Sequence, residues 1–106
     1  MEILAVNSPY KNNIWRVSNP ILAQKKAFKY LGKYGLLFLS NKKDKKYMVL
    51  DQKGKPVHFG SSDYEDYNKH QDLVRRKNYL NRATNIKGNW RDDKYSPNNL
   101  AIHILW

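Results

Sequence analysis

The pattern of apolar and polar residues predicts a helix near the start of the chain, over residues 20–31. Asn19 is a residue type that caps helices, and the proline after it suits the first helical position. Ile21, Phe28 and Leu31 then fall near one face at helical spacing, with Gln24 and Ala27 between them, so we expect this face to be buried. The glycine that follows favours a helix end there.

Three short apolar runs come next, separated by polar turns, and they predict strands. The runs are Leu36–Leu39, Tyr47–Leu50 and Val57–Phe59. The first turn is rich in lysine, and the second contains Gly54. Because short connections favour antiparallel pairing of successive strands, the sequence predicts a three-stranded antiparallel meander.

The second half of the chain predicts two to three further helices. Ser62–Glu65 matches a capping box, which would begin a short helical segment over residues 67–70. Asp72 begins a second helix that ends near Thr84, and Ser96 with the proline after it begins a last one. The order of elements predicts an α+β fold: an N-terminal helix, the meander, then helices packed on one face of the sheet.

The length of 106 residues indicates one domain. Ile3–Val6 and Ile14–Val17 are strand-like runs on either side of a turn-rich stretch, so we expect residues 1–18 to form an N-terminal arm or a loose hairpin. We then expect residues 19–106 to form a single α+β domain.

Lysine and arginine outnumber aspartate and glutamate by 20 to 9, which gives the chain a formal charge of +11. This charge favours an anionic partner, which is nucleic acid, an anionic membrane or an acidic protein surface. Ten lysines but only two carboxylates lie between residues 25 and 55, which indicates a cationic end opposite an aromatic C-terminal end. The candidate polyanion-binding residues are Lys25, Lys26, Lys29, Lys42, Lys43, Lys45, Lys46, Arg75 and Arg76.

The aromatic residues offer a second kind of contact. Tryptophan and tyrosine anchor many protein interfaces. The candidate interface residues here are Trp15, Trp90, Trp106 and Tyr95. Tyrosines interspersed with basic residues also allow stacking on unpaired bases, although tyrosines more often serve in a core or at a protein interface.

The sequence offers little for catalysis. It has no cysteine, which excludes disulfides, zinc fingers and thiol catalysis. The three histidines lack the spacing of a metal site, and no phosphate-binding loop or nucleophile elbow is present. We therefore expect no enzymatic activity, no metal and no cofactor. The open alternative is a nuclease-like enzyme that uses Asp63, Glu65 or His70.

Short segments after Ala27 carry a resemblance to a known family. The segments are Lys46–Val49, Gly54–Gly60, Tyr64–Tyr67, Lys69–His70, Asp72, Arg75–Arg76, Tyr79–Leu80, Gly88–Trp90 and Tyr95–Leu100. On these segments the chain resembles a family of small, basic, uncharacterised proteins encoded by nucleocytoplasmic large DNA viruses, the giant viruses and their relatives. The resemblance implies a virion component, either a minor capsid protein or an internal structural protein.

Charge, aromatic residues and resemblance together predict a non-enzymatic virion component of a large DNA virus. Its partners would be other virion proteins, with acidic neighbours or the genome as the contacts of its basic surface. The alternative is a sequence-nonspecific DNA- or RNA-binding protein that contacts phosphates. The N-terminus lacks the features of a signal peptide, and no apolar run is long enough to span a membrane. We therefore expect synthesis in the host cytoplasm and a location in the virion.

Overall fold

The computed structural model describes residues 13–106, so the predicted run Ile3–Val6 lies outside the described residues. Helix α1 spans Pro20–Leu31 and begins as predicted. The Asn19 side-chain oxygen accepts hydrogen bonds from the backbone N–H groups of Ile21 and Leu22, at 3.1 and 3.2 Å. These two bonds satisfy amide groups that the first helical turn leaves without a partner.

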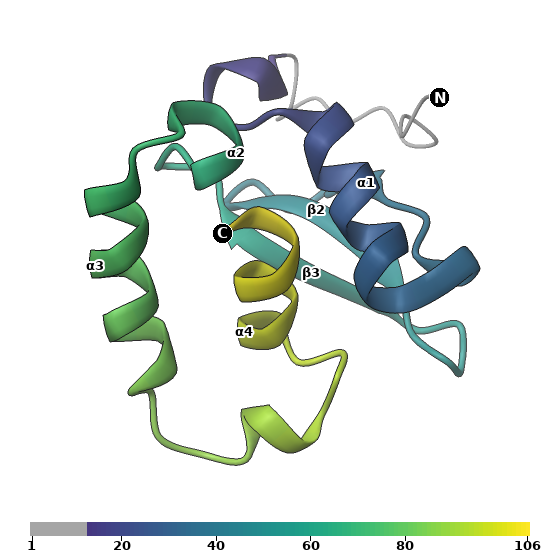
Figure 1. Ribbon diagram of the computed structural model, residues 1–106. Helices are drawn as coiled ribbons and strands as arrows, with labels where there is room; N and C mark the ends of the chain where they lie inside the picture. The colour runs from purple at the N-terminus through teal and green to yellow at the C-terminus, as the bar shows by residue number, and fades with distance from the viewer. Residues whose placement is uncertain (1–12) are drawn as a thin grey trace.

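The buried face of α1 agrees with the predicted one at Gln24 and Ala27 but differs from it at Ile21. Ala23, Gln24 and Ala27 are buried, whereas Ile21 is 56% exposed. Helix α1 packs on the C-terminal segment of the chain, which lies beside it in Figure 1. Small alanine side chains allow this close approach, so the bulkier Ile21 and Phe28 lie to the side of the contact. The prediction that Ile21 lies on the buried face was therefore wrong.

The predicted meander is confirmed. Strands β1 (Phe38–Leu39), β2 (Lys45–Leu50) and β3 (Pro56–Ser61) pair antiparallel in the order β1-β2-β3. Leu39 pairs with Tyr47, and Tyr47 pairs with Phe59 across the sheet. All three are buried. One face of the sheet thereby presents a continuous apolar row to the core.

Five further helical elements follow the sheet. Helix α2 spans Tyr67–His70 and helix α3 spans Leu73–Thr84. A 3₁₀ turn, η3 (Trp90–Asp92), precedes helix α4 (Pro97–Leu100), which continues into the π-helical turn η4 (Ala101–Leu105). Figure 1 shows α4 over the sheet, with α1 on one side of it and α3 on the other. The α+β class is thus confirmed.

The helix starts at Asp72 and Ser96 agree with the sequence, but the predicted capping box does not form. Asp72 accepts from the backbone of α3, and Ser96 accepts from the backbone of α4. Helix α2 begins instead after Asp66, whose carboxylate accepts from the N–H of Lys69 at 3.1 Å. The hydroxyl of Ser62 instead donates to the carbonyl of Lys43 in the β1–β2 turn.

The core lies between the buried face of the sheet and the C-terminal segment. Leu100, Ile104 and Leu105 are fully buried against it. Leu105 lies so close to Gly60 that a Cβ there would be 2.7 Å from the leucine methyl group, and Gly60 also has φ +81°. Within residues 13–106, no helix is both long and apolar enough to cross a membrane.

The segment before α1 also joins the core. Ile14 is buried in a 3₁₀ turn, η1 (Ile14–Arg16), where the sequence had predicted a strand-like run. The N–H of Asp66 donates to the carbonyl of Val17, and Ser18 is fully buried. Residues 14–18 therefore pack as part of the domain that the sequence had predicted to begin at residue 19.

Candidate functional site

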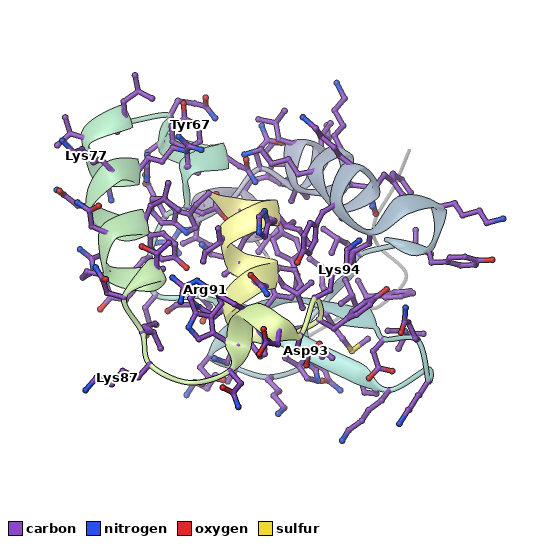
Figure 2. All side chains as sticks on the ribbon, turned by 60° about the horizontal axis from the view of Figure 1, so that its bottom comes forward. Tyr67, Lys77, Lys87, Arg91, Asp93 and Lys94 are labelled. Carbon is purple, nitrogen blue, oxygen red and sulfur yellow. The ribbon has the colours of Figure 1, made fainter. Side chains whose placement is uncertain are left out.

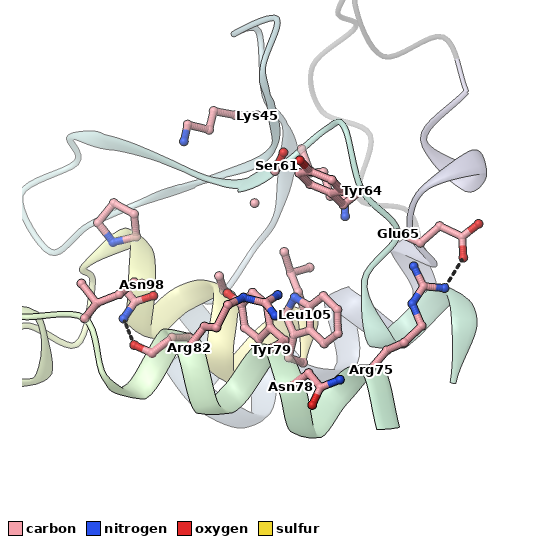
Figure 3. Close-up of a pocket in the computed structure, with 17 residues that line it drawn as sticks. Lys45, Ser61, Tyr64, Glu65, Arg75, Asn78, Tyr79, Arg82, Asn98 and Leu105 are labelled. Atoms are coloured by element: carbon pink, nitrogen blue, oxygen red, sulfur yellow. Dashed lines mark hydrogen bonds and ion pairs between the residues drawn. The ribbon is translucent and has the colours of Figure 1, made fainter. Parts of the chain in front are cut away.

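A cavity of about 670 Å³ lies between α3 and the rest of the molecule, and we call it the α3 cleft (Figure 3). One wall consists of five α3 residues, Arg75, Asn78, Tyr79, Arg82 and Ala83. The opposite wall consists of Lys45 of β2, Ser61 of β3, and Tyr64 and Glu65 of the loop that follows. Ala101, Leu105 and Trp106 lie at the base.

The cleft exists because α3 is attached to the body by a few specific contacts. The Tyr79 ring stacks on Trp106, with ring centres 4.1 Å apart and planes 5° apart. The Arg76 side chain donates from Nε to the carbonyl of Trp106 at 2.7 Å. Near the helix end, Asn98 donates to the carbonyl of Ala83 at 3.0 Å. Close packing along the whole of α3 would fill the space that these contacts leave open.

The α3 cleft carries an excess of positive charge. Lys45, Arg75 and Arg82 bring cations from two elements, as Figure 3 shows. Among the described lining residues, the one acidic side chain is Glu65, whose carboxylate lies 3.8 Å from the Arg75 guanidinium. Both members of this pair are partly exposed, so solvent screens their attraction and the guanidinium can exchange partners readily.

Lys46 is not a surface cation, which corrects its prediction as a polyanion-binding residue. It is 2% exposed, and its ammonium lies 3.3 Å from the buried carboxylate of Asp66. Burial lowers the pKa of Lys46 and raises the pKa of Asp66, while the attraction between the two charges opposes both shifts. The hydroxyl of Tyr47 donates to Ser18 at 2.7 Å, and a hydrogen bond from Ser18 also favours the Asp66 carboxylate. This network ties β2 to the start of α2.

The other predicted cations separate into groups. Lys45 and Arg75 meet at the α3 cleft. Arg76 points inward instead, with its guanidinium carbon 5.2 Å from the centre of the Tyr67 ring, and Lys26 of α1 lies 5.4 Å from the same ring. The remaining predicted cations lie at exposed positions, on α1 and on the β1–β2 turn. They are Lys25, Lys29, Lys42 and Lys43.

These groups do not form the single cationic end that the sequence had indicated. Figure 1 places α1 and α3 on opposite sides of α4, so the lysines of α1 lie away from the α3 cleft.

The aromatic C-terminal end also differs from expectation. Trp106 and Tyr95 pack against the core, and the Trp90 indole N–H donates to the carbonyl of Ile86 at 2.7 Å. Of the four predicted interface residues, Trp15 is the exposed one.

The sequence offers Arg82 as a bidentate phosphate contact and Tyr64 and Tyr79 as stacking tyrosines. Sequence reasoning did not join them into one site, and it missed Asn78. A signal was present for the three of these residues that lie on α3, because residues 75, 78, 79 and 82 recur at the spacing of one helix face. That face carries two arginines, an amide and an aromatic ring, which is unusual for a face buried in a core. Tyr64 gave no such signal, because only the fold brings its loop opposite α3.

The residues of the nuclease-like alternative do not gather into a metal site. Within residues 13–106, no three His, Asp or Glu side chains are placed to hold a metal ion together. Glu65 pairs with Arg75, and His70 accepts from the N–H of Asp72 through Nδ1 at 2.9 Å. Burial, followed by the charge of Arg75, lowers the pKa of His70.

Comparison with known proteins adds a family but no activity. Residues 36–83 are similar to a family of unknown function, DUF5754. The match covers less than half of the chain, from the sheet to the last turn of α3, and so includes both walls of the α3 cleft. No curated protein and no solved structure matches the chain.

Proposed function

We propose that this protein is a non-enzymatic nucleic-acid-binding protein that holds phosphates at the α3 cleft. The observation that carries the proposal is the placement of Lys45, Arg75 and Arg82 around one cavity that also contains aromatic rings. Arginine grips a phosphate with two parallel hydrogen bonds, and lysine adds a mobile point charge. Such contacts position a nucleic acid without reading its sequence, so binding would be sequence-nonspecific.

The charge of the whole chain supports the same ligand class. A formal charge of +11 attracts a polyanion over a distance of about 10 Å at moderate salt. Each phosphate that the protein neutralises releases counterions from the nucleic acid. Binding carried by the cleft cations would therefore weaken steeply as salt rises.

The test is a fluorescence anisotropy titration with labelled nucleic acid over a series of salt concentrations. Arg82→Gln and Lys45→Gln should each weaken binding and reduce the salt slope by about 1, because each removes about one phosphate contact. Lys77→Gln is the matched control, since Lys77 lies on the same helix as Arg82 but points away from the body (Figure 2). It should leave the salt slope close to that of the unmodified protein.

Two results would overturn the proposal. One is the absence of binding to either single-stranded or duplex nucleic acid at low salt. The other is an equal loss for Arg82→Gln and Lys77→Gln, which would mean that net charge rather than the α3 cleft carries the affinity. Circular dichroism of each variant checks that the fold is kept.

The resemblance to proteins of large DNA viruses adds a second candidate, a minor capsid or internal structural protein of the virion. The exposure of Trp15, and of the consecutive residues Leu73 and Val74 in the first turn of α3, favours contacts with other proteins. This role is compatible with nucleic-acid binding beneath a capsid. Mass spectrometry of purified particles should find the protein at fixed stoichiometry, and its absence from them would rule the role out.

A further inference from the structure

The cations of the α3 cleft lie in a concave site. Proteins that read duplex DNA insert a helix or a β-ribbon into a groove of the nucleic acid, so the reading element protrudes. Here the cationic side chains line a cavity of about 670 Å³ between α3 and the body. A cavity of this size accommodates a group of small-molecule dimensions, such as an unpaired nucleotide. A strand that enters it must be free of its complement.

Tyr64 provides an aromatic platform in this cavity. Its side chain is 69% exposed, and its ring stacks on no other ring among residues 13–106. The Tyr79 ring differs, because one of its faces is already occupied by Trp106. In Figure 3, Tyr64 lies on the wall opposite Tyr79 and Arg82. An exposed ring beside cations is the arrangement that single-strand-binding proteins use to stack bases.

Polar groups for a base edge lie on the same walls. The amide of Asn78 is exposed and forms no hydrogen bond with the described residues, and the hydroxyl of Ser61 is on the opposite wall. Amide side chains form hydrogen bonds with base edges that a duplex would hide. The α3 cleft thus combines phosphate, base-face and base-edge contacts.

We infer that the α3 cleft binds single-stranded nucleic acid, with one unpaired base on Tyr64 and the adjoining phosphates on Lys45 and Arg82. The inference rests on the proposed function and narrows it to one class of ligand. Duplex nucleic acid would contact the outer cations only, so it would bind more weakly and would not depend on Tyr64.

The experiment compares a labelled single strand of mixed sequence with the duplex of the same sequence. Tyr64→Ala should weaken single-strand binding about 5- to 100-fold, the usual effect of losing one stacked base. Tyr64→Phe should retain the affinity because the ring face is kept. Duplex binding should change by less than about twofold with either variant, because phosphate contacts do not involve the ring.

The control is Tyr34→Ala, since Tyr34 is 75% exposed in the 3₁₀ turn that follows α1 and is not among the residues that line the cleft. The affinity of the Tyr34→Ala variant for the single strand should stay unchanged. The inference is overturned, and the proposed function kept, if the protein binds duplex at least as tightly as single strand or if Tyr64→Ala has no effect on the single strand. It is equally overturned if Tyr34→Ala matches the loss of Tyr64→Ala. If the protein binds neither the single strand nor the duplex, both this inference and the proposed function are overturned.

Discussion

Helices α1 and α3 have 12 residues each and opposite surroundings. The residues that α1 buries are Pro20, Ala23, Gln24 and Ala27. In α3, Ala83 is the one buried residue. Both helices begin at a capping side chain and carry several cations, so their sequences alone make them look alike. What distinguishes them is what each helix packs against.

The two helices are also held in different ways. Helix α1 packs on η4, and Gln24 ties it to the strand region by two buried hydrogen bonds, one to the carbonyl of Gly35 and one from the N–H of Leu37. Helix α3 depends on the Tyr79–Trp106 stack and a few polar contacts. The difference shows that α1 builds the core, whereas α3 leaves one face lining the α3 cleft.

The largest expected effect comes from the ion pair that ties β2 to the segment leading into α3. Lys46→Met should lower the free energy of unfolding by about 3–5 kcal/mol, because it leaves the buried carboxylate of Asp66 without its cation. Chemical denaturation measures this loss. Lys77→Met, on the exposed side of α3, is the matched control and should change stability by less than about 0.5 kcal/mol.

A double-mutant cycle isolates the ion pair itself. Asp66→Asn keeps a side chain that can cap α2 and removes the buried negative charge. The variant that carries both Lys46→Met and Asp66→Asn should therefore be more stable than the sum of the two single losses predicts. Additive losses would show that Lys46 contributes only packing.

Much of the fold could be predicted from the sequence because helix starts and turns are local. Asn19, Asp72 and Ser96 cap the helices as expected, since a cap depends on residues within one turn. The buried face of α1 could not be predicted in the same way. Hydrophobicity placed Ile21 inside, but the close approach of η4 selects alanines, and that approach is a tertiary feature.

The candidate site was harder to predict because it is assembled from distant parts of the chain. The density of lysine marked residues 25–55, yet the fold distributes these lysines over separate surfaces and buries Lys46. Arg82 and Tyr64 are far apart in sequence and face each other only because α3 stands away from the sheet. The helical spacing of Arg75 and Arg82 was the one local clue.

A smaller effect is expected from a matched pair of amide side chains, one on each helix. Gln24→Ala should cost about 2–4 kcal/mol, because it leaves the buried N–H of Leu37 and the carbonyl of Gly35 without partners. Asn78→Ala on α3 should change stability by less than about 0.5 kcal/mol, since its side chain is exposed. Thermal or urea unfolding compares the two, and similar losses would contradict the division between the helices.

The smallest effect sharpens the comparison most, because it tests α3 alone. Tyr79→Ala removes the ring that stacks on Trp106, a contact that contributes about 0.5–1.5 kcal/mol beyond the burial of the ring. Hydrogen exchange of backbone amides should then become faster in α3 while α1, β2 and β3 keep their protection, because α3 can open without the core. Tyr79→Phe keeps the stacked ring and should preserve the slow exchange. If hydrogen exchange becomes faster in both α1 and α3 of the Tyr79→Ala variant, the two helices open as one cooperative unit. The exposed face of α3 would then not reflect a weaker attachment of that helix.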